Sequence, residues 1–125
     1  MKVLFVRHGE SVDDIEKRYG GWADYPLTPR GKAQIRNKIT AIKSINGQFE
    51  AIFASPLKKA QVSAKILSNN LRIPFQTLEY VKERNTYGLL SGMKKVDAVK
   101  KYPIQVKRLD KGIHVDGKRD TFIYK

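Results

Sequence analysis

The chain contains 125 residues, and its 25 Lys and Arg against 12 Asp and Glu give a formal net charge of +13 at pH 7. With 41% hydrophobic and 30% charged residues the composition is typical of a globular protein, and no apolar run approaches the ~20 residues that a membrane helix needs. Because cysteine is absent, disulfides, thiolate zinc sites and a cysteine nucleophile are excluded, and we expect a cytoplasmic protein. The length predicts one domain spanning residues 1–125.

The positive charge is concentrated in the second half of the sequence. Residues 1–57 hold 9 basic and 6 acidic side chains, whereas residues 58–125 hold 16 basic and 6 acidic ones. A basic surface favours anionic partners such as nucleic acid, acidic lipid or phosphorylated small molecules. A solvated lysine-rich face is the simpler interpretation, and we prefer it for most of this charge.

The first predicted element is a short buried strand. Residues 2–6 (KVLFV) are rich in β-forming apolar side chains, and the pattern ends abruptly at Arg7-His8-Gly9. Residues 10–27 show no sustained period and predict a long loop, which in a compact domain is usually functional. Trp22 and Tyr25 in this loop could be pocket walls or, equally, core aromatics.

A helix is predicted next, because Thr28-Pro29 is typical of an N-cap followed by a first helical residue. Ile35, Ile39 and Ile42 then recur at helical spacing and form one apolar stripe, and Asn46-Gly47 is expected to end the helix.

A second strand and helix follow. Residues 51–54 (AIFA) predict a short strand, and Ser55-Pro56 repeats the pattern of a capping residue followed by proline. The apolar stripe of this helix consists of Leu57, Ala60, Ala64, Leu67 and Leu71.

The remaining elements are shorter. Ile73-Pro74 breaks the second helix, and residues 75–81 are a candidate third strand. Residues 82–93 indicate a loop, residues 94–102 a short basic helix stopped by Pro103, and residues 104–125 are left unassigned.

Alternating strands and helices predict an α/β fold with a mostly parallel sheet. Ligands of such sheets bind beyond the carboxyl ends of the strands, where this chain places polar clusters after each predicted strand. The clusters are Arg7–Ser11, Ser55–Lys59 and Glu83–Asn85. An imidazole, guanidinium and ammonium groups and a carboxylate suit a phosphoester, which needs a nucleophile, cations for the phosphoryl oxygens and a proton donor.

Four segments resemble the histidine phosphatase superfamily, also called phosphoglycerate mutase-like. They are LFVRHGES at 4–11, RYGGWADYPLTPRGKAQ at 18–34, FASPLKKAQVSAKIL at 53–67 and KERNTYGLLSG at 82–92. A lone RHG tripeptide is a weak signal, but all four motifs occur in order, and the resemblance covers residues 1 to about 103. It implies a three-layer α/β/α fold.

The resemblance also implies roles for single residues. His8 matches the nucleophile that becomes phosphohistidine, Arg7 the neighbouring phosphate-binding arginine, and Glu83 the acid that protonates the leaving oxygen. The further residues expected to bind substrate or phosphate are Lys59, Arg84, Gly21 and Ser11. Trp22 matches the segment that shapes the pocket mouth, and no cofactor or metal is expected.

Three departures from the family pattern stand out. Lys59 occupies the position of a second phosphate-binding arginine, and Asp14 that of an asparagine that contacts phosphate. The family's second active-site histidine, in an HG pair after a later strand, has no counterpart after residue 9, since His114 lies in a turn-like GIHVDG and is interpreted as a surface residue. We therefore expect a C-terminally incomplete fold. Ser55 is interpreted as a helix N-cap, and for Lys59 a solvent-facing position is as plausible as an inward one.

The leading hypothesis is a phosphomonoester hydrolase or phosphomutase acting on a small phosphorylated substrate, with hydrolysis favoured over mutase activity. One alternative is a truncated or degenerate member that binds phosphate compounds with little activity. A second is a basic nucleic-acid-binding module, which charge alone supports and which we do not expect. No membrane association is expected, and an exposed sheet edge could pair with a second copy.

Overall fold

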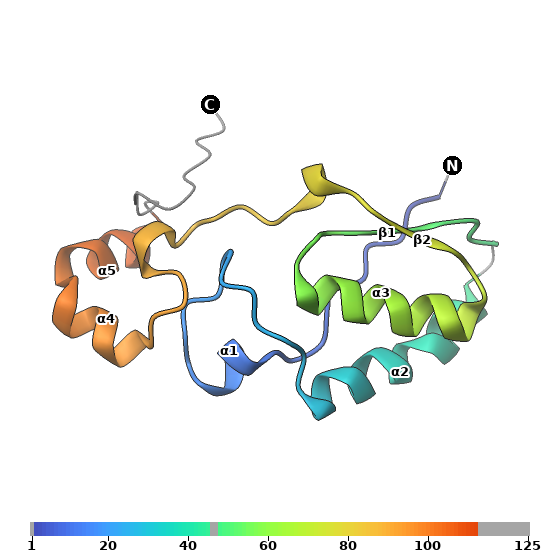
Figure 1. Ribbon diagram of the computed structural model, residues 1–125, viewed down its shortest axis with the longest axis horizontal. Helices are drawn as coiled ribbons and strands as arrows, with labels where there is room; N and C mark the ends of the chain where they lie inside the picture. The colour runs from blue at the N-terminus through green and yellow to red at the C-terminus, as the bar shows by residue number, and fades with distance from the viewer. Residues whose placement is uncertain (1, 46–47, 113–125) are drawn as a thin grey trace. The chain divides into compact units, whose positions relative to one another are not determined.

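Figure 1 shows the computed structural model of the chain, which describes residues 2–45 and 48–112. In chain order the helices and strands are α1 (Val12–Ile15), α2 (Pro29–Ser44), β1 (Ile52–Ala54), α3 (Lys58–Leu71), β2 (Phe75–Thr77), α4 (Lys95–Lys101) and α5 (Pro103–Asp110). Two 3₁₀ turns, Glu79–Val81 and Gly88–Leu90, follow β2. The described residues divide into two units: unit 1 comprises residues 2–12 and 25–82, and unit 2 comprises residues 13–24 and 83–112.

The start of α2 is the one predicted from the sequence. The Thr28 hydroxyl accepts the N–H of Gly31 at 2.9 Å, and Pro29 is the first helical residue. This bond satisfies one of the amide donors that a helix leaves without a partner in its first turn. The helix ends at Ser44, and the predicted stop at Asn46-Gly47 lies outside the described residues.

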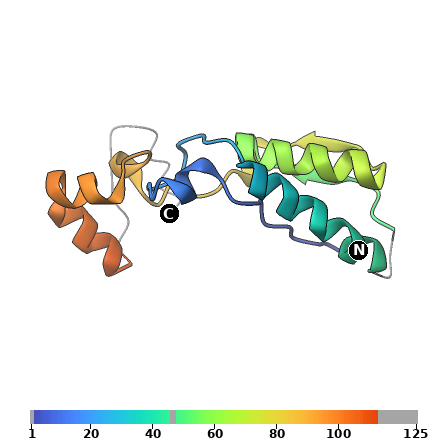
Figure 2. The same ribbon diagram turned by 90° about the horizontal axis from the view of Figure 1, so that it is seen from below.

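A parallel pair of strands joined by α3 forms the centre of unit 1. β1 pairs with β2 in the register Ile52↔Phe75 to Ala54↔Thr77, and α3 packs against both strands and against α2. Figures 1 and 2 show α2 and α3 side by side. The predicted α/β class, with parallel strands and a helical crossover, is confirmed.

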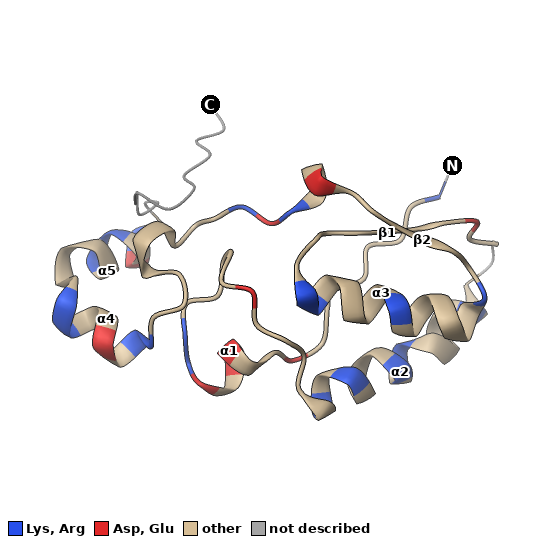
Figure 3. Ribbon diagram, in the orientation of Figure 1, with Lys and Arg blue, Asp and Glu red and all other residues tan. Residues whose placement is uncertain are grey.

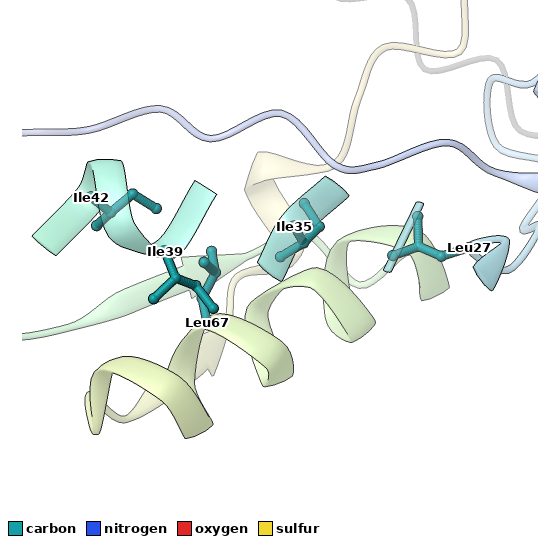
Figure 4. Packing of buried hydrophobic residues seen from close by; sticks show 5 residues of the cluster. All are labelled: Leu27, Ile35, Ile39, Ile42 and Leu67. Atoms are coloured by element: carbon teal, nitrogen blue, oxygen red, sulfur yellow. The ribbon is translucent and has the colours of Figure 1, made fainter. Parts of the chain in front are cut away.

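The core of unit 1 is aliphatic and comes mostly from the predicted helix stripes. Figure 4 shows its five buried members along the two helices, with Ile39 of α2 next to Leu67 of α3; the five are Leu27, Ile35, Ile39, Ile42 and Leu67. Ile35 is completely buried and the other four are at least nine-tenths buried. Fully burying one such side chain contributes about 1.5–3 kcal/mol, so this cluster is the main source of stability that the sequence pattern predicted.

Three details of the prediction for unit 1 are wrong. Residues 2–6 are not a buried strand. Among the described residues they are not paired with either strand of the sheet, and Phe5 is 92% exposed. Apolar β-forming residues become a strand only with a neighbouring strand to pair with. The third strand is residues 75–77 instead of 75–81, because the chain turns at Glu79–Val81, where Tyr80 is exposed.

The third error concerns the start of α3. Ser55 is not its N-cap, because the helix begins at Lys58 and the capping position is Leu57. The Ser55 hydroxyl instead accepts the N–H of Leu57 at 3.3 Å and closes a turn before the helix. Leu57 is buried, as its place in the predicted stripe requires.

Unit 2 packs around a second apolar cluster, formed by Leu90, Ala98 and Val106. The predicted basic helix at 94–102 is confirmed as α4 and ends before Pro103, as predicted. Pro103 then begins α5, which extends into the segment 104–125 that the sequence left unassigned. Proline is favoured at the first position of a helix because that position needs no N–H donor. Figure 3 shows lysine and arginine on both helices, in keeping with the basic second half of the sequence.

The loop that starts in α1 is tied to the rest of unit 2 through its backbone. Tyr19 exchanges backbone hydrogen bonds with Met93 and Gly92, and the Arg18 guanidinium donates to the Gly92 carbonyl at 2.8 Å. The Tyr19 ring lies 5.1 Å from that of Tyr87. Burial, with the charge of Asp110 and the neighbouring Tyr87, raises the pKa of Tyr19 above its usual value near 10.0, so this phenol stays neutral.

We predict that the isolated chain self-associates or has a low melting temperature. Phe5 is 92% exposed, Val3 is 62% exposed, and Phe53 in β1 is 57% exposed, on the opposite sheet face from the buried Ala54. Exposed apolar side chains favour association, and Phe53 belongs to a short parallel sheet that could pair with a second copy. Sedimentation should show species larger than a monomer, and the double variant Phe5→Lys, Phe53→Lys should shift the distribution toward monomer.

Tyr80→Lys is the matched control, because Tyr80 is an equally exposed aromatic on the 3₁₀ turn after β2. It should leave the distribution unchanged. A monodisperse wild-type monomer that melts cooperatively above ~65 °C, the upper end of the mesophile range, would contradict the prediction.

Candidate functional site

The ring of His8, the predicted nucleophile, is held by its own backbone. His8 is half-buried, and its Nδ1 lies 2.6 Å from the carbonyl oxygen of Gly9. A carbonyl oxygen only accepts hydrogen bonds, so in the neutral ring Nδ1 carries the proton and Nε2 carries the lone pair. This is the tautomer in which Nε2 is ready to attack an electrophile.

The loop that carries His8 is pressed against the first turn of α2. A Cβ atom added at Gly9 would lie 2.1 Å from the Gly31 carbonyl oxygen, and one added at Gly31 would lie 2.0 Å from the Glu10 carbonyl oxygen. The Glu10 carboxylate accepts a hydrogen bond from the Thr28 hydroxyl at 2.8 Å and lies 3.7 Å from the Arg30 guanidinium. Two glycines and a capping threonine thus fix the backbone on the carboxyl side of His8.

Arg7 and Ser11 stand on either side of this anchored peptide. The backbone carbonyl of Arg7 accepts a hydrogen bond from the Lys38 ammonium at 2.8 Å, and Arg7 itself is exposed. Ser11 is completely buried and pairs with Leu27 in an antiparallel bridge. The RHGES motif therefore has fixed backbone points at both ends.

Lys59 is buried in the first turn of α3, with 7% of its surface exposed. The solvent-facing alternative considered for this lysine is wrong. Its neighbour Lys58 is exposed, so the two adjacent lysines differ in environment.

The other predicted site residues belong to unit 2, where the glycine-rich loop contacts the segment after residue 82. Gly21 has a φ of +59°, and a Cβ atom there would lie 2.9 Å from the Ser91 hydroxyl and 3.0 Å from the Asn85 amide oxygen. The Trp22 indole N–H donates to the Glu83 carbonyl oxygen. Gly21 therefore satisfies a backbone requirement that other residues meet only with strain.

The predicted site residues thus fall into two groups. Unit 1 carries Arg7, His8, Ser11 and Lys59, and unit 2 carries Gly21, Glu83 and Arg84. Glu83 and Arg84 are exposed, whereas Trp22 and Tyr25 are half-buried. Asp14, at the family's asparagine position, is exposed in α1, and His114 lies outside the described residues.

Two contributors to this site escaped the sequence analysis, although both stand in a quoted motif. Gly31 and Gln34 belong to the LTPRGKAQ segment and follow Thr28 at intervals of three residues. That spacing places all three near one face of α2, which was the available signal. Within the described ranges no group of three His, Asp or Glu side chains could hold a metal ion, and no helix there is long and apolar enough to cross a membrane.

Comparison with known proteins identifies the family. The chain is 34% identical over 101 residues to the uncharacterized phosphatase PhoE of Bacillus subtilis, covering 81% of this chain and 51% of that protein. It is 32% identical over 103 residues to 2,3-bisphosphoglycerate-dependent phosphoglycerate mutase 2 of Gloeobacter violaceus, covering 80% and 46%. The structure of YhfR from Bacillus stearothermophilus matches with a TM-score of 0.72 and 26% identity over 82% of this chain and 50% of that one.

The chain therefore spans about half the length of the curated relatives that it matches. The profile of the histidine phosphatase superfamily (branch 1) matches residues 3–117. With the four ordered motifs and the shared fold, this match shows that the chain belongs to the histidine phosphatase superfamily, as the resemblance implied.

Proposed function

We propose that this chain is a phosphoryl-transfer protein that works through a phosphohistidine on His8. The observation that carries the proposal is the contact of 2.6 Å between the His8 Nδ1 and the Gly9 carbonyl oxygen, which leaves the Nε2 lone pair available. In the first step Nε2 attacks phosphorus in line, an N–P bond forms and the P–O bond to the leaving group breaks. In the second step water attacks phosphorus, and the N–P bond breaks to release inorganic phosphate.

The charges and the proton in these steps come from the other predicted residues. Arg7 and Lys59, with Arg84 as a further cation, stabilise the negative charge on the phosphoryl oxygens. Glu83 gives its proton to the leaving oxygen and then takes one from the attacking water. Gly21 and Ser11 are further proposed substrate- or phosphate-binding residues. None of these steps calls for a metal or cofactor.

We infer hydrolysis of small phosphomonoesters in the cytoplasm by a single domain. Both a phosphatase and a phosphoglycerate mutase are among the relatives, so a second hydroxyl can replace water as the acceptor. Nothing in the sequence identifies a sugar-acid substrate, and hydrolysis is the more general reaction.

Assay of the purified chain against p-nitrophenyl phosphate and several natural phosphomonoesters tests this function. Release of inorganic phosphate above the His8→Ala background supports it. Absence of release together with tight phosphate binding would support the second candidate, a phosphate-binding member with little activity. The buried Lys59 favours that candidate, because lysine lacks the bidentate fork of arginine.

A third outcome would support the nucleic-acid alternative. It is binding to nucleic acid whose affinity falls steeply with salt, combined with absence of phosphatase activity, since such binding depends on the release of counterions.

We predict that Lys59→Arg raises phosphate affinity or turnover, whereas Lys59→Met lowers both. Lys59 is buried, so a guanidinium at this position can offer two parallel donors to a phosphoryl group. Charge-assisted hydrogen bonds are worth about 1.5–3 kcal/mol each. Steady-state kinetics and phosphate titration measure the effect. Lys58→Met is the matched control, since Lys58 is exposed on the same turn. Unchanged KM and kcat in both Lys59 variants would exclude a phosphate contact.

A further inference from the structure

The peptide unit between Gly9 and Glu10 is hydrogen-bonded on both sides. Its carbonyl oxygen lies 2.6 Å from the His8 Nδ1, and its N–H donates to the side-chain oxygen Oε1 of Gln34 at 2.8 Å. The carbonyl and the N–H of one peptide lie in one rigid plane and point in opposite directions. The side chain of Gln34 and the ring of His8 are therefore joined through a single planar group.

This peptide is also confined by its packing. The position of a Gly31 Cβ would be 2.8 Å from the Glu10 nitrogen and 2.0 Å from the Glu10 carbonyl oxygen, so the backbone of α2 lies directly against it. The Glu10 carbonyl oxygen in turn accepts the N–H of Thr28 at 3.0 Å. These contacts with α2 hold the backbone at Glu10, so the main motion left to the Gly9–Glu10 peptide is a rotation about its flanking single bonds. The hydrogen bond from the Glu10 N–H to Gln34 opposes this rotation.

We infer that Gln34 is a positioning residue that sets the tautomer and the orientation of the His8 ring through the Gly9–Glu10 peptide. Gln34 accepts a hydrogen bond from the Glu10 N–H and so orients the Gly9 carbonyl toward the His8 Nδ1. In the neutral ring this carbonyl keeps the proton on Nδ1 and the lone pair on Nε2. The assignment of Oε1 as the acceptor follows from chemistry, because a backbone N–H needs an oxygen opposite it. The role in phosphoryl transfer rests on the proposed function, whereas the effect on the tautomer does not.

The first test is spectroscopic and needs no activity. In the full chain labelled with ¹⁵N-histidine, two-bond ¹⁵N–¹H spectra distinguish a protonated Nδ1 from a protonated Nε2, and His8→Ala identifies which of the two histidines gives each signal. Wild-type His8 should show the Nδ1–H tautomer when the ring is neutral. Gln34→Leu, which has no acceptor, should shift the ring toward a mixture containing the Nε2–H tautomer. Gln34→Glu keeps an acceptor oxygen and should retain the wild-type tautomer.

Asn37→Leu is the matched control, because Asn37 is an exposed polar residue one turn further along α2. It should leave the His8 signals unchanged. If Gln34→Leu fails to fold, Gln34→Met replaces it, since methionine has a similar length and only a weak acceptor. An Nδ1–H tautomer that persists in the folded Leu or Met variant would overturn the inference, and so would an equal shift in Asn37→Leu.

The second test follows the rate at which phosphohistidine forms from p-nitrophenyl phosphate. Gln34→Leu should slow it about five- to tenfold, the factor that one ordinary hydrogen bond supplies, while Gln34→Glu restores most of the rate. The slower rate should appear in kcat with little change in KM, because Gln34 binds the loop and not the substrate. Absence of phosphohistidine in every variant, with the tautomer shift present, would contradict the proposed function and still support the positioning by Gln34.

Discussion

His8→Ala is expected to abolish covalent phosphoryl labelling of the chain. In the native protein the Gly9 carbonyl keeps the proton on Nδ1, so the Nε2 lone pair is free to form an N–P bond. Alanine removes the proposed nucleophile completely, and no cysteine can replace it because the sequence has none. A radiolabelled phosphoryl donor, followed by rapid denaturation, should yield a phosphate that is stable to base and labile to acid, and only when His8 is present.

Two controls make this experiment decisive. His114→Ala removes the second histidine of the chain and should keep the native level of label. A native circular dichroism spectrum of His8→Ala shows that the loss is chemical. Labelling of His8→Ala at the level of the native chain would refute the assignment of the nucleophile.

The second large effect is expected from Gly31→Ala, which should destabilise the chain and also remove the proposed phosphatase activity. In a helix alanine is normally favoured over glycine by about 0.5–1 kcal/mol. At Gly31 the new Cβ atom would lie 2.0 Å from the Glu10 carbonyl oxygen, and the obstructing atom belongs to the backbone. Overpacking of this kind costs about 1–3 kcal/mol or more, so the normal preference is reversed.

Thermal melting and the phosphatase assay measure the two consequences. The melting temperature of Gly31→Ala should fall by several degrees, since 1 kcal/mol corresponds to roughly 2–8 °C in domains of this size range. Thr40→Ala is the control, because Thr40 is exposed on the same helix and gains helix propensity without meeting a neighbour. A Gly31→Ala variant at least as stable as the native chain would show that the loop and α2 separate easily.

The helices of this chain were predictable because their signals are local. Thr28, Pro29 and the isoleucines of α2 stand within one 16-residue element and its cap, and their burial follows directly from their spacing. The strand predicted at residues 2–6 is wrong because its signal was not sufficient by itself. Its sequence has the composition of a strand, but pairing depends on a neighbour far away in the sequence, and composition contains no information about that neighbour.

The site shows the same division between local and distant information. His8 and Lys59 could be singled out by their type and by their positions near predicted strands. Lys59 is buried and its neighbour Lys58 is exposed, because the two lie on different sides of α3. The sequence, which has lysine where the family has arginine, did not show which side faces the core. The bond from Glu10 to Gln34 joins residues 24 positions apart, and no local pattern predicts it.

The attachment of the His8 loop to the first turn of α2 has a consequence for how the proposed activity should respond to heating. The terminal turns of helices fray at lower free energies than their interiors, and local openings of this kind precede global unfolding. Thr28, Gly31 and Gln34 all lie at the amino-terminal end of α2, whereas the core residues Ile39 and Ile42 lie toward the other end. The amide of Glu10 should therefore exchange with solvent deuterium sooner than that of Ile39. Order at the proposed nucleophile then depends on the helix end. A partial, reversible opening there would switch the proposed chemistry off while the part of the core around Ile39 and Ile42 stays closed.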